Sequence, residues 1–345
     1  MTPQKSETVG IAAVGYYVPE GIITSQEISR LSRIPTDVLI DKIGMEKKHV
    51  AGPNEQPSDM GIRAAKDALK RAGVDASEIG IIVYCGASFY DYRMWSPAAC
   101  IQAALGADDC YAFEVKNGCN GGNLGLNLCK NLLQNDSEKR YGLVVCSEKL
   151  SPCIDYTDPR SLSLFIVGDG AVAAVIGKGV PGNRILEYAS RTDGSTVDCV
   201  KVPIGGTKLP YGQDAECDPR GKWLCVDDPD GFDRILSETY LENYVRAISG
   251  AVSKSGYSIN DIDLLFTNQV KRSLSQNIFQ SFGLSEKNTL ASIKEYGHMG
   301  TVDTLFNLGR AWDRGLIKPG NLVVIASSGA GFTWAALALK FHDRK

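Results

Sequence analysis

The sequence predicts an α/β fold in which two pseudo-symmetric halves stack their sheets in five layers, αβαβα. An internal repeat and the alternation of helix and strand patterns carry this prediction. The stretch AAKDALKRAGVDASEIGIIV, from Ala64 to Val83, reads as an amphipathic helix, a glycine stop and a buried strand, and AISGAVSKSGYSINDIDLLF, from Ala247 to Phe266, repeats that order. Gly73 corresponds to Gly256, an offset of 183 residues.

A second repeated strand supports the division into two halves. Residues 143–147, LVVCS, match residues 322–326, LVVIA, at an offset of 179, and short insertions explain the small difference. Strands that alternate with helices predict parallel or mixed sheets covered by helices on both faces, here around shared central helices. VPGNR, which follows residues 168–177, reads as a linker, so we expect one half at 1–178 and the other at 179–345. Residues 190–235 lack periodicity and are expected to form an inserted surface excursion.

The composition excludes several classes of protein. With 345 residues, 43% hydrophobic and 22% charged, the chain is long enough for a large core and unlike disordered or membrane proteins. A net charge of -3 gives no signature of nucleic-acid binding. No apolar run approaches the roughly 18 residues of a membrane span and the N-terminus lacks a signal-peptide pattern, so we expect a cytoplasmic protein. Ten cysteines without CxxC pairs argue against zinc sites and a disulfide framework, and no metal or redox cofactor is expected.

The candidate nucleophile is Cys119, in the run EVKNGCNGG. This run is expected to end a strand and open a helix, where unsatisfied N–H groups and the positive end of the helix dipole stabilise a thiolate. The flanking glycines allow a substrate to approach the backbone. A buried structural cysteine in a glycine turn is the alternative. GCNGG lacks the GxGxxG spacing of a dinucleotide-binding turn.

The candidate partner of the thiol is His298, in EYGHMGTVD. The repeat places position 302 opposite Cys119, so this loop and the cysteine turn are expected at equivalent places in the two halves. Asp303 follows near a helix start, where its carboxylate can accept the imidazole N–H and fix the tautomer. Helix capping is the alternative role for both residues. The other two histidines, at positions 49 and 342, lie in a charged run and in the C-terminal tail.

At these residues the chain resembles the β-ketoacyl-ACP synthase III family of the thiolase superfamily over essentially its full length. The stretches that carry the resemblance are IGMEKKHVAGPNE, SPAACIQAALGADDCYAFEVKNGCNGG, LFIVGDGAVAAVIG, FTNQVKRSLSQNIFQSFGL and GLIKPGNLVVIASSGAGFTWAALALKF. The resemblance implies a thiolase-like fold, a homodimer, a tunnel that accepts pantetheine and an acyl-enzyme on Cys119. It also implies acyl-CoA or acyl-carrier-protein thioesters as substrates and no tightly bound cofactor.

Two site residues are exchanged relative to the family pattern. Family members pair the cysteine with a histidine in a PHQAN-like stretch and an asparagine in an HGN-like stretch, and the two hydrogen-bond a malonyl thioester carbonyl while carbon dioxide leaves. Here FTNQVK places Asn268 at the histidine position and YGHMG places His298 at the asparagine position, with the family's spacing of 30 residues between them. With Asp303 behind it, His298 looks like a general base. The Cys-His-Asp set resembles a branch of synthase-III-like acyltransferases in specialised metabolism.

The resemblance also implies an oxyanion hole and an acyl pocket. The oxyanion hole would consist of the backbone N–H of Cys119 and one from the SSGAG loop, at Ser328, Gly329 or Ala330. Trp95 stands where the family places a bulky side chain that closes the acyl pocket of the partner subunit, which implies a compact acyl group. A tryptophan with apolar neighbours is otherwise a core residue.

Three basic residues match the family's entrance for nucleotide phosphates or the acidic carrier protein. They are Lys42, Lys271 and Arg272. Solvated surface charge is the alternative for all three. Val38 replaces the family's entrance tryptophan and Lys42 its nearby arginine, which favours a carrier-protein donor.

Three functions are compatible with the sequence. The first is an acyltransferase that esterifies or amidates an alcohol or amine, a small-molecule acceptor. The second is a condensing enzyme, decarboxylative or non-decarboxylative, that forms a carbon–carbon bond in polyketide or fatty-acid priming, with Asn268 and His298 sharing the malonyl oxyanion. The third is a non-enzymatic partner subunit, which the joint presence of a thiol, a base and its orienting carboxylate disfavours.

Overall fold

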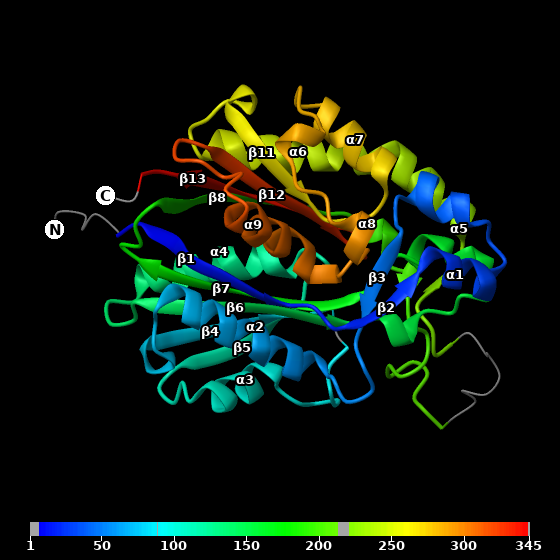
Figure 1. The fold of residues 1–345 in the computed structure, drawn as a ribbon, viewed down its shortest axis with the longest axis horizontal. Coiled ribbons are helices and arrows are strands. Elements are labelled where there is room, and N and C mark those ends of the chain that lie inside the picture. Colours follow the sequence, from blue (N-terminus) through cyan, green and yellow to red (C-terminus); the bar gives the residue numbers. More distant parts are fainter. Residues whose placement is uncertain (1–6, 88, 213–220, 344–345) are drawn as a thin grey trace.

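The computed structural model describes residues 7–87, 89–212 and 221–343. Figure 1 shows five layers: helices below, a sheet, central helices, a second sheet and helices above. The predicted α/β, thiolase-like fold with two stacked halves is confirmed.

The N-terminal half builds a five-stranded mixed sheet. Its strands are β1 (Val9–Tyr17), β4 (Ile79–Cys85), β5 (Tyr111–Val115), β6 (Tyr141–Lys149) and β7 (Asp169–Lys178). The spatial order is β1-β7-β6-β4-β5, with β4 parallel to both β5 and β6, and β7 antiparallel to β6 and β1. Every residue of β4 is buried, as its unbroken apolar run predicts for a strand covered on both faces.

The C-terminal half repeats this topology with four strands. They are β8 (Asn183–Thr192), β11 (Ile262–Thr267), β12 (Leu322–Gly329) and β13 (Thr333–Phe341), in the order β11-β12-β13-β8. β11 and β12 are parallel, as β4 and β6 are, and β13 is antiparallel to both of its neighbours, as β7 is. The repeat seen in the sequence is therefore a repeat of sheet topology. The proposed division between residues 178 and 179 falls between β7 and β8, which belong to different sheets.

The helices form the remaining three layers. α2 (Pro57–Ala72) and α3 (Pro97–Leu105) cover the outer face of the N-terminal sheet, and α6 (Leu241–Lys254) and α7 (Arg272–Gln280) cover the outer face of the other. α4 (Gly121–Asn135) and α9 (Asp303–Asp313) lie between the sheets and contact both. α2 ends where the sequence predicts, because Gly73 adopts a left-handed conformation with φ +64° and donates its backbone N–H to the carbonyls of Leu69 and Lys70 in the last turn.

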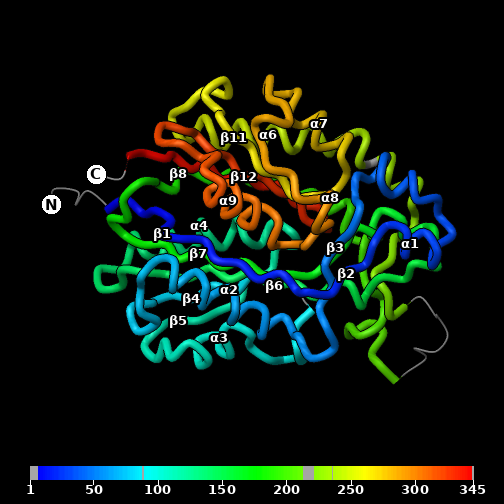
Figure 2. The backbone as a smooth tube through the Cα atoms, in the orientation of Figure 1, coloured from blue at the N-terminus to red at the C-terminus, as the bar shows by residue number. Residues whose placement is uncertain are grey.

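Shorter elements gather at one end of the stacked sheets, as the tube in Figure 2 shows. They are β2 (Gly21–Thr24), α1 (Ser25–Ser32), β3 (Lys47–Val50), β9 (Val200–Lys201), β10 (Cys225–Val226), α5 (Pro229–Ile235) and α8 (Ile293–Tyr296). The expected excursion at 190–235 contains the end of β8, the two-residue strands β9 and β10, and α5. Residues 213–220 of this excursion lie outside the described residues. Within the described parts of the chain, none of the helices has the length and apolar character needed to cross a bilayer.

Candidate active site

Cys119 lies in the turn that joins β5 to α4. It precedes Asn120, the residue that caps α4, and the turn is closed by backbone hydrogen bonds from Asn120 to Asn117 and from Gly121 to Gly118. Gly118 has φ +52°, and a Cβ there would stand 3.1 Å from the Cα of Gly329. Glycine is therefore needed both for the left-handed conformation and for the close approach of the loop from the other half.

His298 lies in the loop between α8 and α9, the pseudo-equivalent of the cysteine turn. Its backbone N–H donates to the carbonyl of Ile166 at 2.8 Å, and its carbonyl accepts from Gly168 at 2.9 Å. The loop of the C-terminal half is thus tied to the start of β7 in the N-terminal half. Because α4 and α9 lie side by side in the central layer, the two turns meet at the same end of the molecule.

The structure brings Cys119, His298 and Asp303 into one line. Nε2 of His298 lies 3.3 Å from Sγ of Cys119, and Nδ1 lies 2.5 Å from Oδ2 of Asp303. Since a carboxylate only accepts hydrogen bonds, Nδ1 carries a proton and Nε2 is left to exchange one with the thiol. Burial lowers the pKa of His298, but the negative charges of Asp303 and the Cys119 thiolate raise it by more. The pKa of the imidazole therefore lies well above its usual 6.5.

Asp303 is fully buried at the start of α9 and accepts two further hydrogen bonds. The backbone N–H of Gln269 donates to Oδ2 at 2.7 Å, and that of Met299 donates to Oδ1 at 2.8 Å. These two donors fix the carboxylate, so that the carboxylate in turn fixes the imidazole. Neither donor was predicted, because both are backbone N–H groups, which a residue of almost any type would supply at these positions.

Asn268 sits at the end of β11, and the described hydrogen bonds of its amide go elsewhere than to the thiol. Oδ1 accepts from the hydroxyl of Tyr244 and from the backbone N–H of Ser328 at 3.3 Å, while Nδ2 donates to the carbonyl of Ser328 at 3.3 Å. Sequence analysis did not single out Tyr244 or its neighbour Tyr240. Their spacing of four residues, which places both on one face of α6, was the available signal.

The expected oxyanion donors lie in two loops that touch. A Cβ on Gly329 would stand 3.0 Å from the backbone N of Cys119, and one on Gly118 would stand 3.2 Å from that of Ala330. Ser327 donates its hydroxyl to the carbonyl of Cys119 at 3.0 Å, which holds the two loops together. The backbone N–H of Ser328, also an expected oxyanion donor, instead donates to Oδ1 of Asn268.

The expected entrance residues are exposed and lie on neighbouring elements. Lys42 belongs to a wide helical turn, Val38–Ile43, while Lys271 and Arg272 begin α7, which contacts that turn. Arg272 also forms an ion pair with Glu286 at 3.2 Å, so part of its charge is already matched.

Trp95 is half-buried in the loop before α3. Its ring meets the exposed ring of Tyr92 edge-on, with centroids 5.8 Å apart. The role of Trp95 in a partner's acyl pocket stays a prediction.

A buried carboxyl close to the histidine loop was not predicted. Glu148 ends β6, and its Oε1 accepts from the hydroxyl of Thr301 at 2.8 Å and from the backbone N–H of Ala87 at 2.9 Å. Its Oε2 is buried without a hydrogen-bond partner among the residues that the structure describes. Burial raises the pKa of this carboxyl to about 7 against the pull of those hydrogen bonds.

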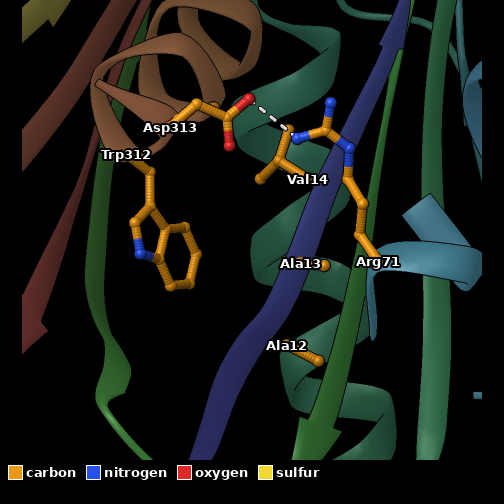
Figure 3. A pocket seen from close by; sticks show the side chains of 7 residues that line it. Ala12, Ala13, Val14, Arg71, Trp312 and Asp313 are labelled. Carbon is orange, nitrogen blue, oxygen red and sulfur yellow. Dashed lines mark hydrogen bonds and ion pairs between the residues drawn. The ribbon is translucent and has the colours of Figure 1, made fainter. Parts of the chain in front are cut away.

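Figure 3 shows a separate pocket of about 170 Å³ between β1, α2 and α9. It contains none of the predicted site residues. Its charged groups, Arg71 and Asp313, pair with each other at 2.7 Å, which leaves little for a ligand. In the described part of the chain, His, Cys, Asp and Glu side chains form no group of three that is fit to hold a metal ion.

Comparisons with known proteins show which family the chain is similar to. The family model of 3-oxoacyl-[acyl-carrier-protein] synthase III matches residues 113–194, and the model of its C-terminal part matches residues 252–341. The chain is 29% identical over 342 residues to β-ketoacyl-[acyl-carrier-protein] synthase III of Symbiobacterium thermophilum, covering 98% of this chain and 99% of that protein. It is also 29% identical over 334 residues to the protein of that name from Syntrophomonas wolfei, covering 96% and 97%.

Two solved structures illustrate the similarity of fold. The priming β-ketosynthase of the R1128 polyketide pathway superposes with a TM-score of 0.86 at 23% identity, over 100% of this chain and 99% of that one. β-Ketoacyl-[acyl carrier protein] synthase III from Thermus thermophilus superposes with a TM-score of 0.84 at 25% identity, over 96% and 99%.

The stacked halves and the cysteine at their junction define an acyltransferase of the thiolase superfamily, an enzyme that takes acyl groups from thioesters. Within that superfamily the chain is similar to the β-ketoacyl-ACP synthase III family, to which both matched family models and the curated relatives belong.

Proposed function

We propose that the enzyme transfers an acyl group from an acyl-CoA or acyl-carrier-protein thioester through Cys119 to an alcohol or amine of a small molecule, in specialised metabolism. The line Cys119–His298–Asp303 carries the proposal, with separations of 3.3 and 2.5 Å. A histidine oriented by a buried carboxylate serves both as the base that activates a nucleophile and as the acid that protonates a leaving group. Condensation after loss of carbon dioxide needs no base to activate its nucleophile.

In the first half-reaction, the Cys119 thiolate attacks the thioester carbonyl. The C–S bond to the donor breaks, and the donor thiolate leaves with the proton held on Nε2 of His298. In the second half-reaction, His298 removes the proton of the acceptor O–H or N–H while the acceptor attacks the acyl carbon. The bond to Sγ then breaks, and Asp303 stabilises the imidazolium in both steps. The backbone N–H groups of Cys119 and Ala330, from the two touching loops, are the proposed donors to the oxyanion.

A second candidate is a condensing enzyme that joins the acyl group to a malonyl-derived carbon. The names of the curated relatives favour this candidate over acyl transfer to oxygen or nitrogen, since they are called β-ketoacyl-[acyl-carrier-protein] synthase III. The solved priming β-ketosynthase points the same way, towards polyketide priming. Against it stand the exchanged positions of Asn268 and His298 and the hydrogen bonds of the Asn268 amide to Tyr244 and Ser328.

The experiment that separates the two candidates is a chase of the acyl-enzyme. The protein is loaded with a panel of acyl thioesters, and its intact mass is read before and after addition of malonyl-CoA, hydroxylamine or a set of alcohols and amines. Discharge by oxygen or nitrogen nucleophiles but not by malonyl-CoA supports the proposal. Discharge by malonyl-CoA with a β-keto product would overturn it in favour of condensation. Cys119→Ser should lose the adduct, while Cys110→Ser, at another partly exposed cysteine, should retain it.

We also propose a homodimer joined along β5. β5 is an edge strand of the N-terminal sheet, and Tyr111 on it is 57% exposed with its ring stacked on Phe113. An exposed edge strand with aromatic side chains is a template for pairing with a second strand. Pairing of β5 with β5 of a second copy would place the loop that contains Trp95 near the partner subunit. A monomeric mass by light scattering at micromolar concentration would contradict this proposal.

The donor and the compartment also remain proposals. The exposed cluster of Lys42, Lys271 and Arg272 suits the phosphates of CoA or the acidic surface of a carrier protein. Comparing acylation by acyl-CoA and by acyl-carrier protein, at low and high salt, distinguishes these donors. The expected location is the cytoplasm.

A further inference from the structure

A chain of buried polar groups lies beside the active site. Tyr240 caps α6 and Tyr244 follows one turn later, with ring centroids 5.2 Å apart. The hydroxyl of Tyr240 is hydrogen-bonded to Oγ of Ser328, and the hydroxyl of Tyr244 donates to Oδ1 of Asn268. All four side chains are at most 3% exposed.

The backbone of Ser328 decides how the Asn268 amide is turned. Its N–H can only donate and its carbonyl can only accept, so Oδ1 of Asn268 must face the former and Nδ2 the latter. The Tyr244 hydroxyl then supplies the second hydrogen bond to Oδ1. Burial raises the pKa of Tyr244 well above its usual 10, so this hydroxyl stays protonated and keeps donating at any pH at which the enzyme is folded.

Decarboxylative condensation and acyl transfer to an alcohol or amine differ in whether they need the Asn268 amide as a hydrogen-bond donor. Decarboxylative condensation breaks the bond between the malonyl α-carbon and its carboxylate. The electron pair left behind is delocalised onto the thioester oxygen, and the resulting enolate attacks the acyl carbon while the bond to Sγ breaks. That oxygen needs aimed N–H donors. Transfer to an alcohol or amine needs a base instead, which His298 supplies.

We infer that Tyr244 is a specificity-determining residue, which holds the Asn268 amide against the Ser328 backbone and thereby withholds it from a thioester enolate. The inference rests on the proposed transfer function and deepens it. Tyr244 acts through Asn268 and touches no reacting atom, so it is a positioning residue. Its effect lies in the ratio of products rather than in the total rate.

The test is the partition of one acyl-enzyme between two nucleophiles. Enzyme loaded on Cys119 is mixed with malonyl-CoA and hydroxylamine together, and the β-keto product and the hydroxamate are quantified by mass spectrometry. The spontaneous reaction is subtracted with the His298→Ala variant. Tyr244→Phe removes only the hydroxyl, and we expect it to raise the ratio of condensation to transfer about tenfold. The amide then keeps its two hydrogen bonds to the Ser328 backbone but loses the one from Tyr244, so it leaves Ser328 more readily.

Tyr240→Phe is the matched control. It removes a hydroxyl of the same kind and burial, one helical turn away, which contacts Ser328 and Tyr244 and forms none of the described hydrogen bonds to Asn268. Its product ratio should stay within twofold of the wild type. In the double variant Tyr244→Phe/Asn268→Ala the tenfold gain should disappear, because no amide is left to be released. Should Tyr244→Phe fold poorly, Tyr244→Met removes the hydroxyl with a side chain that adapts to the core.

The outcomes separate the inference from the function on which it rests. A wild-type enzyme that condenses and gives no hydroxamate above background overturns the proposed function and the inference together. A wild-type enzyme that transfers, with a Tyr244→Phe ratio within twofold of it, overturns the inference alone. An equal gain in Tyr240→Phe also overturns it, because the effect would then come from loosened packing of α6.

Discussion

Replacing Asp303 by asparagine tests the hydrogen-bond geometry around His298 most directly. Two donors share Oδ2 of Asp303, the imidazole Nδ1–H and the backbone N–H of Gln269, while Oδ1 accepts one described hydrogen bond, from the N–H of Met299. An amide at position 303 has one oxygen and one NH₂ group. If the amide oxygen faces the two donors at the former Oδ2 position, the NH₂ group faces only the N–H of Met299. In the opposite orientation the NH₂ group would face two N–H groups, those of His298 and Gln269. We therefore expect the variant to keep the histidine tautomer and to lose the negative charge.

The magnitude follows from that loss. A hydrogen bond to a charged group contributes about 1.5–3 kcal/mol, and each ~1.4 kcal/mol is a factor of ten in rate. The second half-reaction of Asp303→Asn should thus be about 10- to 150-fold slower than that of the wild type. The unpaired N–H of Met299 should also destabilise the fold by about 1–3 kcal/mol.

The pH profile provides a second readout. Transfer requires unprotonated Nε2, so the wild-type rate rises with pH through the pKa of His298, which Asp303 holds above its usual value. Without the carboxylate, burial lowers this pKa, and the midpoint of the profile should move to lower pH. Acyl-enzyme prepared in advance is mixed with acceptor from pH 5 to 9 and its decay followed by intact mass.

Two results would refute this reasoning. A plateau rate within twofold of the wild type and an unmoved midpoint would reduce Asp303 to a helix cap. A loss near 10⁴-fold, the cost of a wrong tautomer, would mean that the NH₂ group turns towards His298. Asp313→Asn, the same substitution at an exposed carboxylate on the same helix, is the control and should leave the rate unchanged.

Three further variants test other parts of the structure. His298→Ala should abolish transfer yet leave slow acylation of Cys119, and equal loss of both half-reactions would contradict the assigned roles. Glu148→Gln should gain about 3 kcal/mol of stability over the wild type above pH 7 and nothing near pH 4. A carboxyl whose pKa rises from 4.5 to about 7 on folding loses stability as the pH increases through that window, and melting temperatures at both ends check it. Gly125→Ala should destabilise the fold by about 1–3 kcal/mol in thermal melts, because its Cβ would stand 2.4 Å from Sγ of Cys85, and adding Cys85→Ala should restore most of the loss.

Much of the fold is contained in local sequence patterns. The unbroken apolar run of β4 and the matching run of β11 predict strands covered on both faces, and glycines 73 and 256 mark the ends of the helices before them. These signals are local, since they depend on residue spacing and on the left-handed conformation of single glycines. Because the two copies have the same order, the repeat also predicts that their central turns face each other.

The cysteine and histidine of the candidate site could also be identified from the sequence. Cys119 stands in a glycine-rich turn before a helix, and only three histidines are available to serve it. The repeat then selects His298, because its loop is the counterpart of the cysteine turn. Asp303 follows from its place five residues later.

Only the tertiary structure decided what surrounds these residues. The donors that fix Asp303 are backbone N–H groups of Gln269 and Met299, and no pattern of side chains in the sequence predicts them. The sequence offers Asn268 as a partner of the thiol, whereas its described hydrogen bonds go to Tyr244 and Ser328. Such contacts depend on how α6 packs over the end of β12. Local sequence determines elements and candidate groups, but the direction of a hydrogen bond between elements depends on their packing, which is set by the whole core.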